Sequence, residues 1–286
     1  MKLGIIGAEN SHTAAIAKTL NVDKKIKGFT VEYVWGETDE FAKNAAKAGQ
    51  IPNIVKNPRE MLGKIDAVLV DHRHPKYHLP AILPFLKKGI PVFVDKPFCY
   101  RASEGKKALE IAKENKTPIT SFSVIPHQKS FRAFMGKISK AGKILSAASY
   151  GPCDMHSPYG GIFFYGIHQV EAVLKAFGYE VKSVLLSKNG QNAAGQLFYS
   201  NGLIVTMNFI KEACPGFHIS AIGEKGPVSQ ALVFDKEIYL NGIKTFTTMF
   251  RTGKEPETYE HILKPVQVLE ALEKSIKSGN IEEVEK

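Results

Sequence analysis

Short apolar runs alternate with helix-forming segments throughout residues 1–122, and this alternation limits the possible fold more than any other feature of the sequence. Apolar runs separated by helices of about 10–15 residues are typical of βαβ units, whose parallel strands are buried on both faces. The sequence therefore predicts an α/β fold that opens with a Rossmann-like, doubly wound parallel sheet. The expected strands are residues 2–7, 29–35, 65–70, 92–94 and 118–122. The expected helices are residues 13–20, 38–48, 75–88 and 103–115.

The first turn of this pattern has the position of a phosphate-binding turn, because it joins a strand to a helix at the start of the domain. Unpaired backbone amides at a helix N-terminus favour a pyrophosphate. The glycine pattern is irregular, since Glu9 and His12 occupy the second and third glycine positions of G-x-G-x-x-G. An ordinary strand–turn–helix is the alternative. The residues of this turn that we expect to bind a dinucleotide are Gly7, Ala8, Asn10, Ser11 and His12.

Polar residues also follow the next strands, at the edge of the sheet where ligands bind in such folds. Glu37 follows the second strand and is placed to accept hydrogen bonds from an adenosine ribose; a solvated loop acid is the alternative. His72, His74 and His78 follow the third strand. Histidine is a common metal ligand, but no carboxylate or cysteine set completes a site here, so we predict no metal.

The stretch of residues 91–97, Pro-Val-Phe-Val-Asp-Lys-Pro, indicates a buried strand that delivers Lys96 at its carboxyl end. A lysine is almost never fully buried without a partner, so Lys96 is expected to point into a cleft. An ion pair with Asp95 or another carboxylate is the structural alternative.

Residues 123–286 change to a strand-rich pattern and predict a second, α+β domain. An amphipathic helix over residues 129–140 precedes a strand over residues 144–150. Further strands are expected at residues 181–186, 194–199, 203–210, 217–223, 227–234 and 237–240. Turn residues between them indicate an antiparallel meander, and such a sheet commonly leaves one face free. A second subunit would cover that face, so we expect a homo-oligomer, either a dimer or a tetramer.

A polar loop and a helix in this second domain contain the candidate substrate residues. The loop, residues 151–161, contributes His156 and Tyr159, because binding residues concentrate in loops on a rigid scaffold. The helix, residues 162–177, places Tyr165 and His168 on one face and Glu171 on its flank. A histidine in such an apolar helix is otherwise a satisfied core residue.

The chain resembles the glucose–fructose oxidoreductase/inositol dehydrogenase family (Gfo/Idh/MocA) over nearly its whole length. The most specific match is Val94-Asp95-Lys96-Pro97, which is similar to the family's E-K-P motif with aspartate for glutamate. Gly160-Gly161 leading to Gly166-Ile167-His168 is similar to the family's G-G…D-x-G-x-H segment. The other segments that resemble the family are residues 3–7, residues 66–70 followed by His78, and the closing residues 266–279.

The resemblance implies a Rossmann domain, residues 1–122, and a substrate and oligomerisation domain, residues 123–286, with an open, mostly antiparallel sheet. The last helix, residues 263–278, is expected to pack back on the first domain. The implied cofactor is NAD or NADP, and the implied reaction exchanges a hydride with a hydroxyl or carbonyl group of a sugar, polyol or cyclitol. The catalytic residues assigned on this basis are Lys96, His168 and Tyr165. Further cofactor residues are Glu37, His72, His78 and Pro97, and substrate residues are His127, His156, Tyr159 and Glu171.

Four features of the sequence depart from the family pattern. The turn lacks two glycines, and Gly36 stands where many members have a ribose-binding aspartate, which leaves Glu37 as its substitute. Phe164 takes the place of the family acid, and the arginine often found after the sixth strand is absent. Two rival functions therefore stand beside the dehydrogenase: a non-catalytic member that binds a sugar-like ligand or a protein, and a glycoside-cleaving enzyme with transient NAD redox.

Composition and charge limit the classes of partner and the cellular location that we expect. The net charge of +10 is spread over presumed helix surfaces without an arginine-rich run, which argues against a nucleic-acid partner. No apolar run reaches the roughly 18 residues of a membrane span. The cysteines, Cys99, Cys153 and Cys214, are odd in number and well separated, so we expect neither disulfides nor a metal knuckle and a cytoplasmic location.

Overall fold

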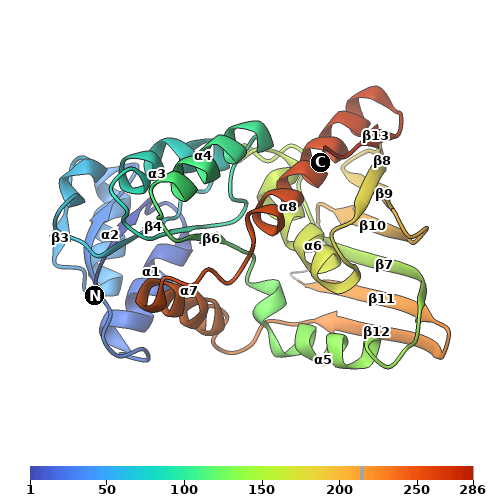
Figure 1. Ribbon diagram of the computed structural model, residues 1–286, viewed down its shortest axis with the longest axis horizontal. Coiled ribbons are helices and arrows are strands. Elements are labelled where there is room, and N and C mark those ends of the chain that lie inside the picture. The colour runs from blue at the N-terminus through green and yellow to red at the C-terminus, as the bar shows by residue number, and fades with distance from the viewer. Residues whose placement is uncertain (213–215, 286) are drawn as a thin grey trace. The chain divides into compact units, whose positions relative to one another are not determined.

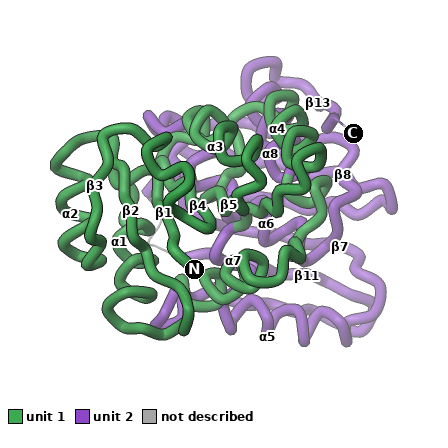
Figure 2. Tube along the Cα trace, turned by 60° about the vertical axis from the view of Figure 1, so that its left-hand side comes forward, with its two compact units in different colours: residues 1–122, 239–262 green, residues 123–238, 263–286 purple. Residues whose placement is uncertain are grey.

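The computed structural model describes residues 1–212 and 216–285, so Cys214 lies outside the described residues. The chain forms two compact units (Figure 2). Unit 1 comprises Met1–Phe122 and Tyr239–Ile262, and unit 2 comprises Ser123–Ile238 and Leu263–Lys286. The segment that returns to unit 1 is thus Tyr239–Ile262. Residues 263–278 are part of unit 2, and their packing on the first domain stays a prediction.

Unit 1 contains a six-stranded sheet in the order β3-β2-β1-β4-β5-β6. Figure 1 labels β3, β4 and β6 of this sheet, and Figure 2 labels β3, β2, β1, β4 and β5. Each neighbouring pair is parallel, which confirms the predicted Rossmann-like fold. The strands are β1 Lys2–Ile6, β2 Thr30–Trp35, β3 Asn53–Ile54, β4 Ala67–Val70, β5 Val92–Val94 and β6 Ile119–Ser121. The prediction missed β3, which has two exposed residues and therefore no apolar signal.

Two helices of unit 1, α1 and α2, begin after a side-chain cap. Thr38 caps α2 by accepting a hydrogen bond from the Phe41 amide, and Asn10 caps α1 in the same way with the His12 amide. The helices are α1 Ser11–Ala17, which continues as a π-helical turn Lys18–Val22, α2 Asp39–Gly49, α3 His78–Leu86, α4 Ala102–Glu114 and α7 Leu240–Thr252. A 3-10 turn, Pro75–Tyr77, precedes α3.

Helix α7 completes the core on one face of this sheet. Its buried side chains Ile243, Phe246, Met249 and Phe250 recur at helical spacing and join the apolar cluster around β1 and β2. The rings of Phe246 and Phe93 lie 4.6 Å apart. The expected strand over residues 237–240 is therefore wrong: Asn241-Gly242, which indicated a hairpin turn, lies inside the first turn of α7.

Unit 2 contains a seven-stranded sheet in the order β12-β11-β7-β10-β9-β8-β13. Strands β7 and β10 are parallel and the other neighbouring pairs are antiparallel, so the sheet is mostly antiparallel as predicted but is not a simple meander. The strands are β7 Ile144–Pro152, β8 Val181–Asn189, β9 Asn192–Tyr199, β10 Ile204–Ile210, β11 Phe217–Gly223, β12 Gly226–Leu232 and β13 Glu282–Glu283.

One face of this second sheet is covered and the other is open. Along β10, the fully buried Val205, Met207 and Phe209 alternate with the more exposed Ile204, Thr206 and Asn208. The helices of the unit are α5 Lys129–Ile138, α6 Ile162–Phe177 and α8 Tyr259–Ser278, whose first residues belong to unit 1. Among the described helices, none is both long enough and apolar enough to cross a membrane.

Candidate cofactor and catalytic site

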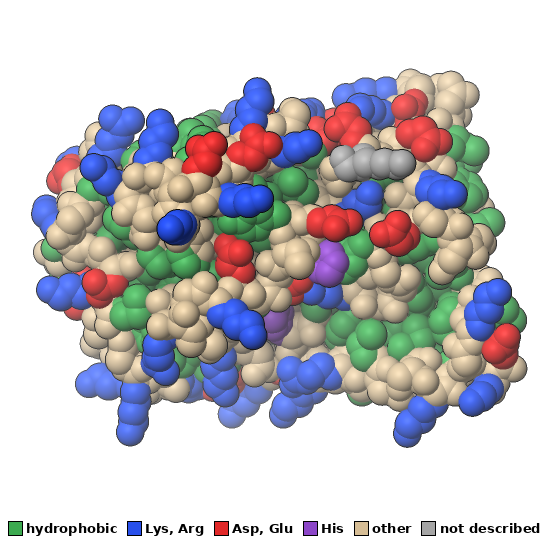
Figure 3. All heavy atoms as spheres, in the orientation of Figure 1, with side chains coloured by type: hydrophobic (Ala, Val, Ile, Leu, Met, Phe, Trp, Pro, Cys, Tyr) green, Lys and Arg blue, Asp and Glu red, His purple; other side chains and the backbone are tan. Residues whose placement is uncertain are grey.

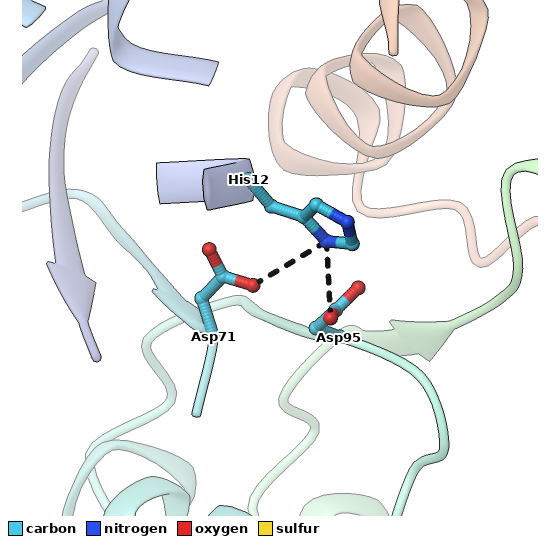
Figure 4. A group of neighbouring side chains, drawn as sticks. All are labelled: His12, Asp71 and Asp95. Atoms are coloured by element: carbon cyan, nitrogen blue, oxygen red, sulfur yellow. Dashed lines mark hydrogen bonds and ion pairs between the residues drawn. The ribbon is translucent and has the colours of Figure 1, made fainter. Parts of the chain in front are cut away.

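The carboxyl edge of the first sheet holds a polar cluster made of the buried Asn10, Thr13, Asp71 and Asp95 and the half-buried His12. Figure 4 shows His12, Asp71 and Asp95. The amide nitrogen of Asn10 donates to Asp71 Oδ1 over 3.0 Å and to Asp95 Oδ2 over 3.1 Å. The ring atom His12 Nδ1 lies 3.1 Å from Asp95 Oδ2 and 3.7 Å from Asp71 Oδ1. The cluster joins the first turn to the residues that follow β4 and β5.

The two carboxyl groups of this cluster are not equivalent. Thr13 Oγ1 lies 2.7 Å from the Gly7 carbonyl oxygen and 2.5 Å from Asp71 Oδ2, yet a hydroxyl has one proton to donate. A proton on Asp71 satisfies both contacts, because Asp71 then donates to Thr13 and Thr13 donates to Gly7. Burial and the neighbouring Asp95 raise the pKa of Asp71 well above its ordinary value, in agreement with this arrangement.

Asp95 is the ionised partner. Burial alone raises the pKa of this carboxyl, but the positive charges of His12 and Lys96 outweigh burial and lower it below its ordinary value. One protonated and one ionised carboxyl group therefore lie side by side, as in other coupled acid pairs. His12, which occupies the third glycine position of the first turn, is thus the charge partner of Asp95 in the Asp-Lys-Pro motif.

His12, Asp71 and Asp95 also offer three ligand atoms within 4.8 Å of one another, which is the spacing of a metal site. The Asn10 amide nitrogen lies 3.4 Å from His12 Nδ1 and within hydrogen-bonding distance of both carboxylates. Asn10 Oδ1 is bound to the His12 amide, which fixes this orientation of the side chain. The two protons of the Asn10 amide are therefore donated to the two carboxyl groups, and the His12 ring is held by Asp95.

Glu37 closes the first turn from the end of β2. Its Oε2 accepts hydrogen bonds from the backbone amides of Ala8 and Glu9, over 2.8 and 2.9 Å. Its Oε1 is buried and has no hydrogen-bond partner among the described residues. Gly7 adopts φ +105, and a Cβ there would lie 2.7 Å from backbone atoms of Asp71 and His72, so the turn requires glycine at this position.

A pocket of about 280 Å³ adjoins the same edge and has a largely apolar lining that includes Ile6, Trp35, Arg59, His72 and Tyr77. The His72 ring lies 5.7 Å from Trp35 and 5.8 Å from Tyr77. Burial, and then the charge of His78, lower the pKa of His72 to about 3, so the ring is neutral. Its Nδ1 is buried without a partner among the described residues. The aromatic wall of Trp35, His72 and Tyr77 has the character of a site for an adenine ring, and Glu37 is not part of this lining.

The remaining predicted cofactor residues differ in exposure. Ser11 is exposed at the start of α1. His78 is fully buried between two backbone carbonyls, with Nε2 2.8 Å from His72 O and Nδ1 2.9 Å from Pro97 O. It ties the segment after β4 to the segment after β5 and thereby positions the loop that carries Lys96. Lys96 itself is buried, with 6% of its surface exposed.

In unit 2, helix α6 brings together Tyr165, His168 and Glu171 as the helical spacing predicts. The rings of Tyr165 and His168 lie 5.6 Å apart in a T-shaped contact, and Tyr165 is 42% exposed. Glu171 is buried, and its Oε2 accepts a hydrogen bond from the Ser123 backbone amide over 2.5 Å. The hydroxyl of Ser123 lies 2.7 Å from His168 Nδ1. Sequence reasoning missed Ser123, whose only local signal is its place just after the last parallel strand.

The other predicted substrate residues lie in loops of unit 2. His127 ends a 3-10 turn, Ile125–His127, and its backbone carbonyl accepts a hydrogen bond from Arg132. The exposed His156 ring contacts the Lys188 ammonium. Tyr159 packs against Phe164, with ring centroids 4.9 Å apart. Phe164, at the family acid position, therefore belongs to an aromatic group in this chain.

The surface charge agrees with the spread that the sequence indicates. Figure 3 shows lysine and arginine side chains dispersed over the visible face, with aspartate and glutamate side chains between them. No continuous basic stripe appears on that face.

Together, the parallel sheet, the turn closed by Glu37 and the polar carboxyl edge define unit 1 as a dinucleotide-binding Rossmann domain. Residues 1–122 match the GFO_IDH_MocA family, described as an oxidoreductase family with an NAD-binding Rossmann fold. This match confirms, at the level of the family, the predicted resemblance and its nicotinamide cofactor. No curated protein matches the sequence.

Solved structures share the fold of the whole chain at low sequence identity. A probable dehydrogenase from Thermotoga maritima is 17% identical, with a TM-score of 0.87 and 99% of each chain covered. A scyllo-inositol dehydrogenase from Lactobacillus casei with bound NAD(H) and scyllo-inositol is 17% identical, with a TM-score of 0.86 and the same coverage. A myo-inositol 2-dehydrogenase from Lactobacillus plantarum is 18% identical, with a TM-score of 0.85, covering 100% of this chain and 99% of its own.

Proposed function

We propose that the protein is an NAD-dependent oxidoreductase that exchanges a hydride with a hydroxyl or carbonyl group of a polyol, cyclitol or sugar. The observation that carries the proposal is the edge of unit 1, where a pocket with an aromatic wall, beside His72, adjoins the turn that Glu37 closes. The inositol dehydrogenases of the same fold support the choice of substrate class.

Each candidate residue has a separate role in the proposed reaction. When bound, nicotinamide supplies the hydride acceptor or donor. Lys96, delivered by β5 beside the ionised Asp95, gives or takes the proton of the substrate hydroxyl at its Nζ. In unit 2, His168 and Tyr165 are assigned to bind the substrate oxygen.

Nucleotide binding is the first test of this function. A ligand that binds the folded state at 100 times its Kd stabilises the protein by about 2.7 kcal/mol, which a thermal-shift measurement detects. We expect NAD to stabilise the protein, and turnover to follow with myo-inositol, scyllo-inositol or a related polyol. Failure of both NAD and NADP to shift the melting temperature would favour the non-catalytic alternative. Tightly retained cofactor with glycoside cleavage and no net reduction would favour transient redox.

Glu37 predicts which nucleotide binds more tightly. A carboxylate accepts from the 2′-hydroxyl of NAD and repels the 2′-phosphate of NADP. We expect NAD to bind more tightly than NADP, and Glu37→Gln to weaken NAD binding by about 10-fold, in line with about 1.5 kcal/mol for a charged hydrogen bond. Calorimetric titration with both nucleotides measures this. The control is Glu40→Gln, the same change at an exposed carboxylate in the first turn of α2, which is expected to leave NAD affinity within about 2-fold. Equal affinity of the unmodified protein for both nucleotides would contradict the prediction.

Homo-oligomerisation remains a prediction. The open face of the second sheet exposes apolar side chains such as Tyr150, Ile204 and Ile222, at 42%, 42% and 54%. A second copy of the chain would bury this face. Light scattering is expected to give a mass of at least two chains at micromolar concentration, and the mass of one chain would rule this out.

A further inference from the structure

The hydroxyl of Ser123 lies against the imidazole of His168 at the start of unit 2. Ser123 is fully buried, and its backbone is fixed by the amide hydrogen bond to Glu171 Oε2. Its Oγ has two hydrogen-bond neighbours among the described residues: the Ile125 amide at 3.2 Å and His168 Nδ1 at 2.7 Å. The inference that follows rests on the proposed function, in which His168 meets the substrate.

Counting hydrogens at Oγ decides the protonation of His168. A serine hydroxyl has one proton to give and lone pairs that accept. The Ile125 amide is a donor, so it can only occupy a lone pair of Oγ. Of the two neighbours, only His168 Nδ1 can accept the hydroxyl proton, and burying a hydroxyl without an acceptor carries a free-energy cost of about 1–3 kcal/mol. The arrangement that satisfies every group has Nδ1 as the acceptor, which places the His168 proton on Nε2.

The ring is also held in its plane by aromatic neighbours. Tyr165 and Phe217 both make T-shaped contacts with His168, at 5.6 and 5.8 Å between ring centroids. Contacts at right angles from two side chains oppose rotation of the ring about its Cβ–Cγ bond. A fixed plane together with a fixed tautomer aims one N–H group.

We propose that Ser123 is a positioning residue that fixes His168 as the Nε2–H tautomer, so that His168 serves the substrate as a hydrogen-bond donor. A donor at this place binds the oxygen of the reacting hydroxyl or carbonyl group. The proton transfer itself then belongs to Lys96, because an imidazole already protonated at Nε2 cannot accept a proton there. Phe164, at the family acid position, brings no carboxylate to the ring, and a neutral serine leaves His168 uncharged.

The test is the tautomer of His168, read by nitrogen NMR of protein labelled in its histidine rings. Protonated and unprotonated ring nitrogens have well separated shifts, and the signals of His168 are identified among the nine histidines by their loss in His168→Gln. At pH 8 we expect a protonated Nε2 and an unprotonated Nδ1 in the unmodified protein. In Ser123→Ala we expect a mixture of the two tautomers. A protonated Nδ1 in the unmodified protein, or an unchanged tautomer in Ser123→Ala, would overturn the proposal.

A matched control separates this role from a general loss of packing. Ser130→Ala removes another buried serine hydroxyl of unit 2, one that donates to the Val233 carbonyl, and is expected to leave the His168 signals unchanged. In a turnover assay, Ser123→Ala should lower kcat about 10-fold and shift its pH profile, while Ser130→Ala should not. Because the NMR result needs no substrate, an expected tautomer in a protein without dehydrogenase activity would reject the proposed function and leave this inference standing.

Discussion

Replacing Lys96 by alanine is expected to lower the turnover of polyol substrates by about 10²–10⁴-fold, the usual contribution of a positioned acid–base group. Lys96 is the residue that β5 delivers to the carboxyl edge, next to the ionised Asp95. Initial rates of NAD reduction at saturating substrate measure the effect. Unchanged turnover in Lys96→Ala would remove Lys96 from the mechanism.

Lys96→Arg separates the proton from the charge. Arginine keeps a positive group beside Asp95, but its guanidinium remains protonated in proteins and cannot take a proton from a hydroxyl. We expect Lys96→Arg to bind NAD like the unmodified protein in a thermal-shift assay and to lose turnover nearly as fully as Lys96→Ala. Activity of Lys96→Arg close to that of the unmodified protein would show that charge alone is needed at this position.

The second large effect is expected at the paired carboxyl groups. Asp95→Asn removes the ionised partner of His12 and should lower the free energy of unfolding by about 3 kcal/mol, as for other buried ion pairs that lose one member. Asp71→Asn should change it by less than about 1 kcal/mol at pH 7, because an amide can donate to Thr13 as the protonated acid does. Urea unfolding followed by the fluorescence of Trp35, the one tryptophan of the chain, reports on unit 1.

The pH dependence of the same measurement tests the protonation of Asp71. Its pKa is raised in the folded state, so above the ordinary value of 3.8 the folded protein retains a proton that the unfolded chain loses. The free energy of unfolding therefore falls as pH rises from about 4, by at most about 1.4 kcal/mol per pH unit. Asp95, with a lowered pKa, contributes stability above 3.8 that is lost as pH falls. Asp71→Asn should abolish the fall toward high pH, and identical pH profiles for the two proteins would contradict a protonated Asp71.

The sequence predicted the first sheet well because each of its elements has a local signal. The apolar runs, the Thr38 and Asn10 caps and the lysine at the end of β5 are all legible within a few residues. Their common position at the carboxyl edge then follows from the parallel arrangement alone. For the same reason Glu37 was assigned correctly to this edge, where it binds the first turn.

What the sequence could not predict depends on partners far apart in the chain. The protonation of Asp71 depends on Thr13, which lies 58 residues earlier in the chain, and on Asp95, which follows the next strand of the sheet. The contact of Ser123 could not be predicted locally, because its partner His168 lies 45 residues later in the chain, on α6. The start of α7 was predicted wrongly because Asn-Gly indicates a hairpin when only neighbouring residues are considered. The helix is stabilised instead by burial of Phe246 and Phe250 against a sheet whose strands lie about 150 residues earlier in the chain.

The return of α7 to unit 1 has a consequence for how the protein is made. The apolar cluster on one face of the first sheet needs Ile243, Phe246, Met249 and Phe250, yet the ribosome completes them only after nearly all of unit 2. Burial of such side chains contributes about 1.5–3 kcal/mol each, a sum comparable with the whole stability of a typical domain. During synthesis, residues 1–122 therefore emerge with an uncovered apolar face, on which chaperones can act. Folding of the first unit is therefore expected to finish late in synthesis, and unit 2 also needs the residues that follow α7, Leu263–Lys286.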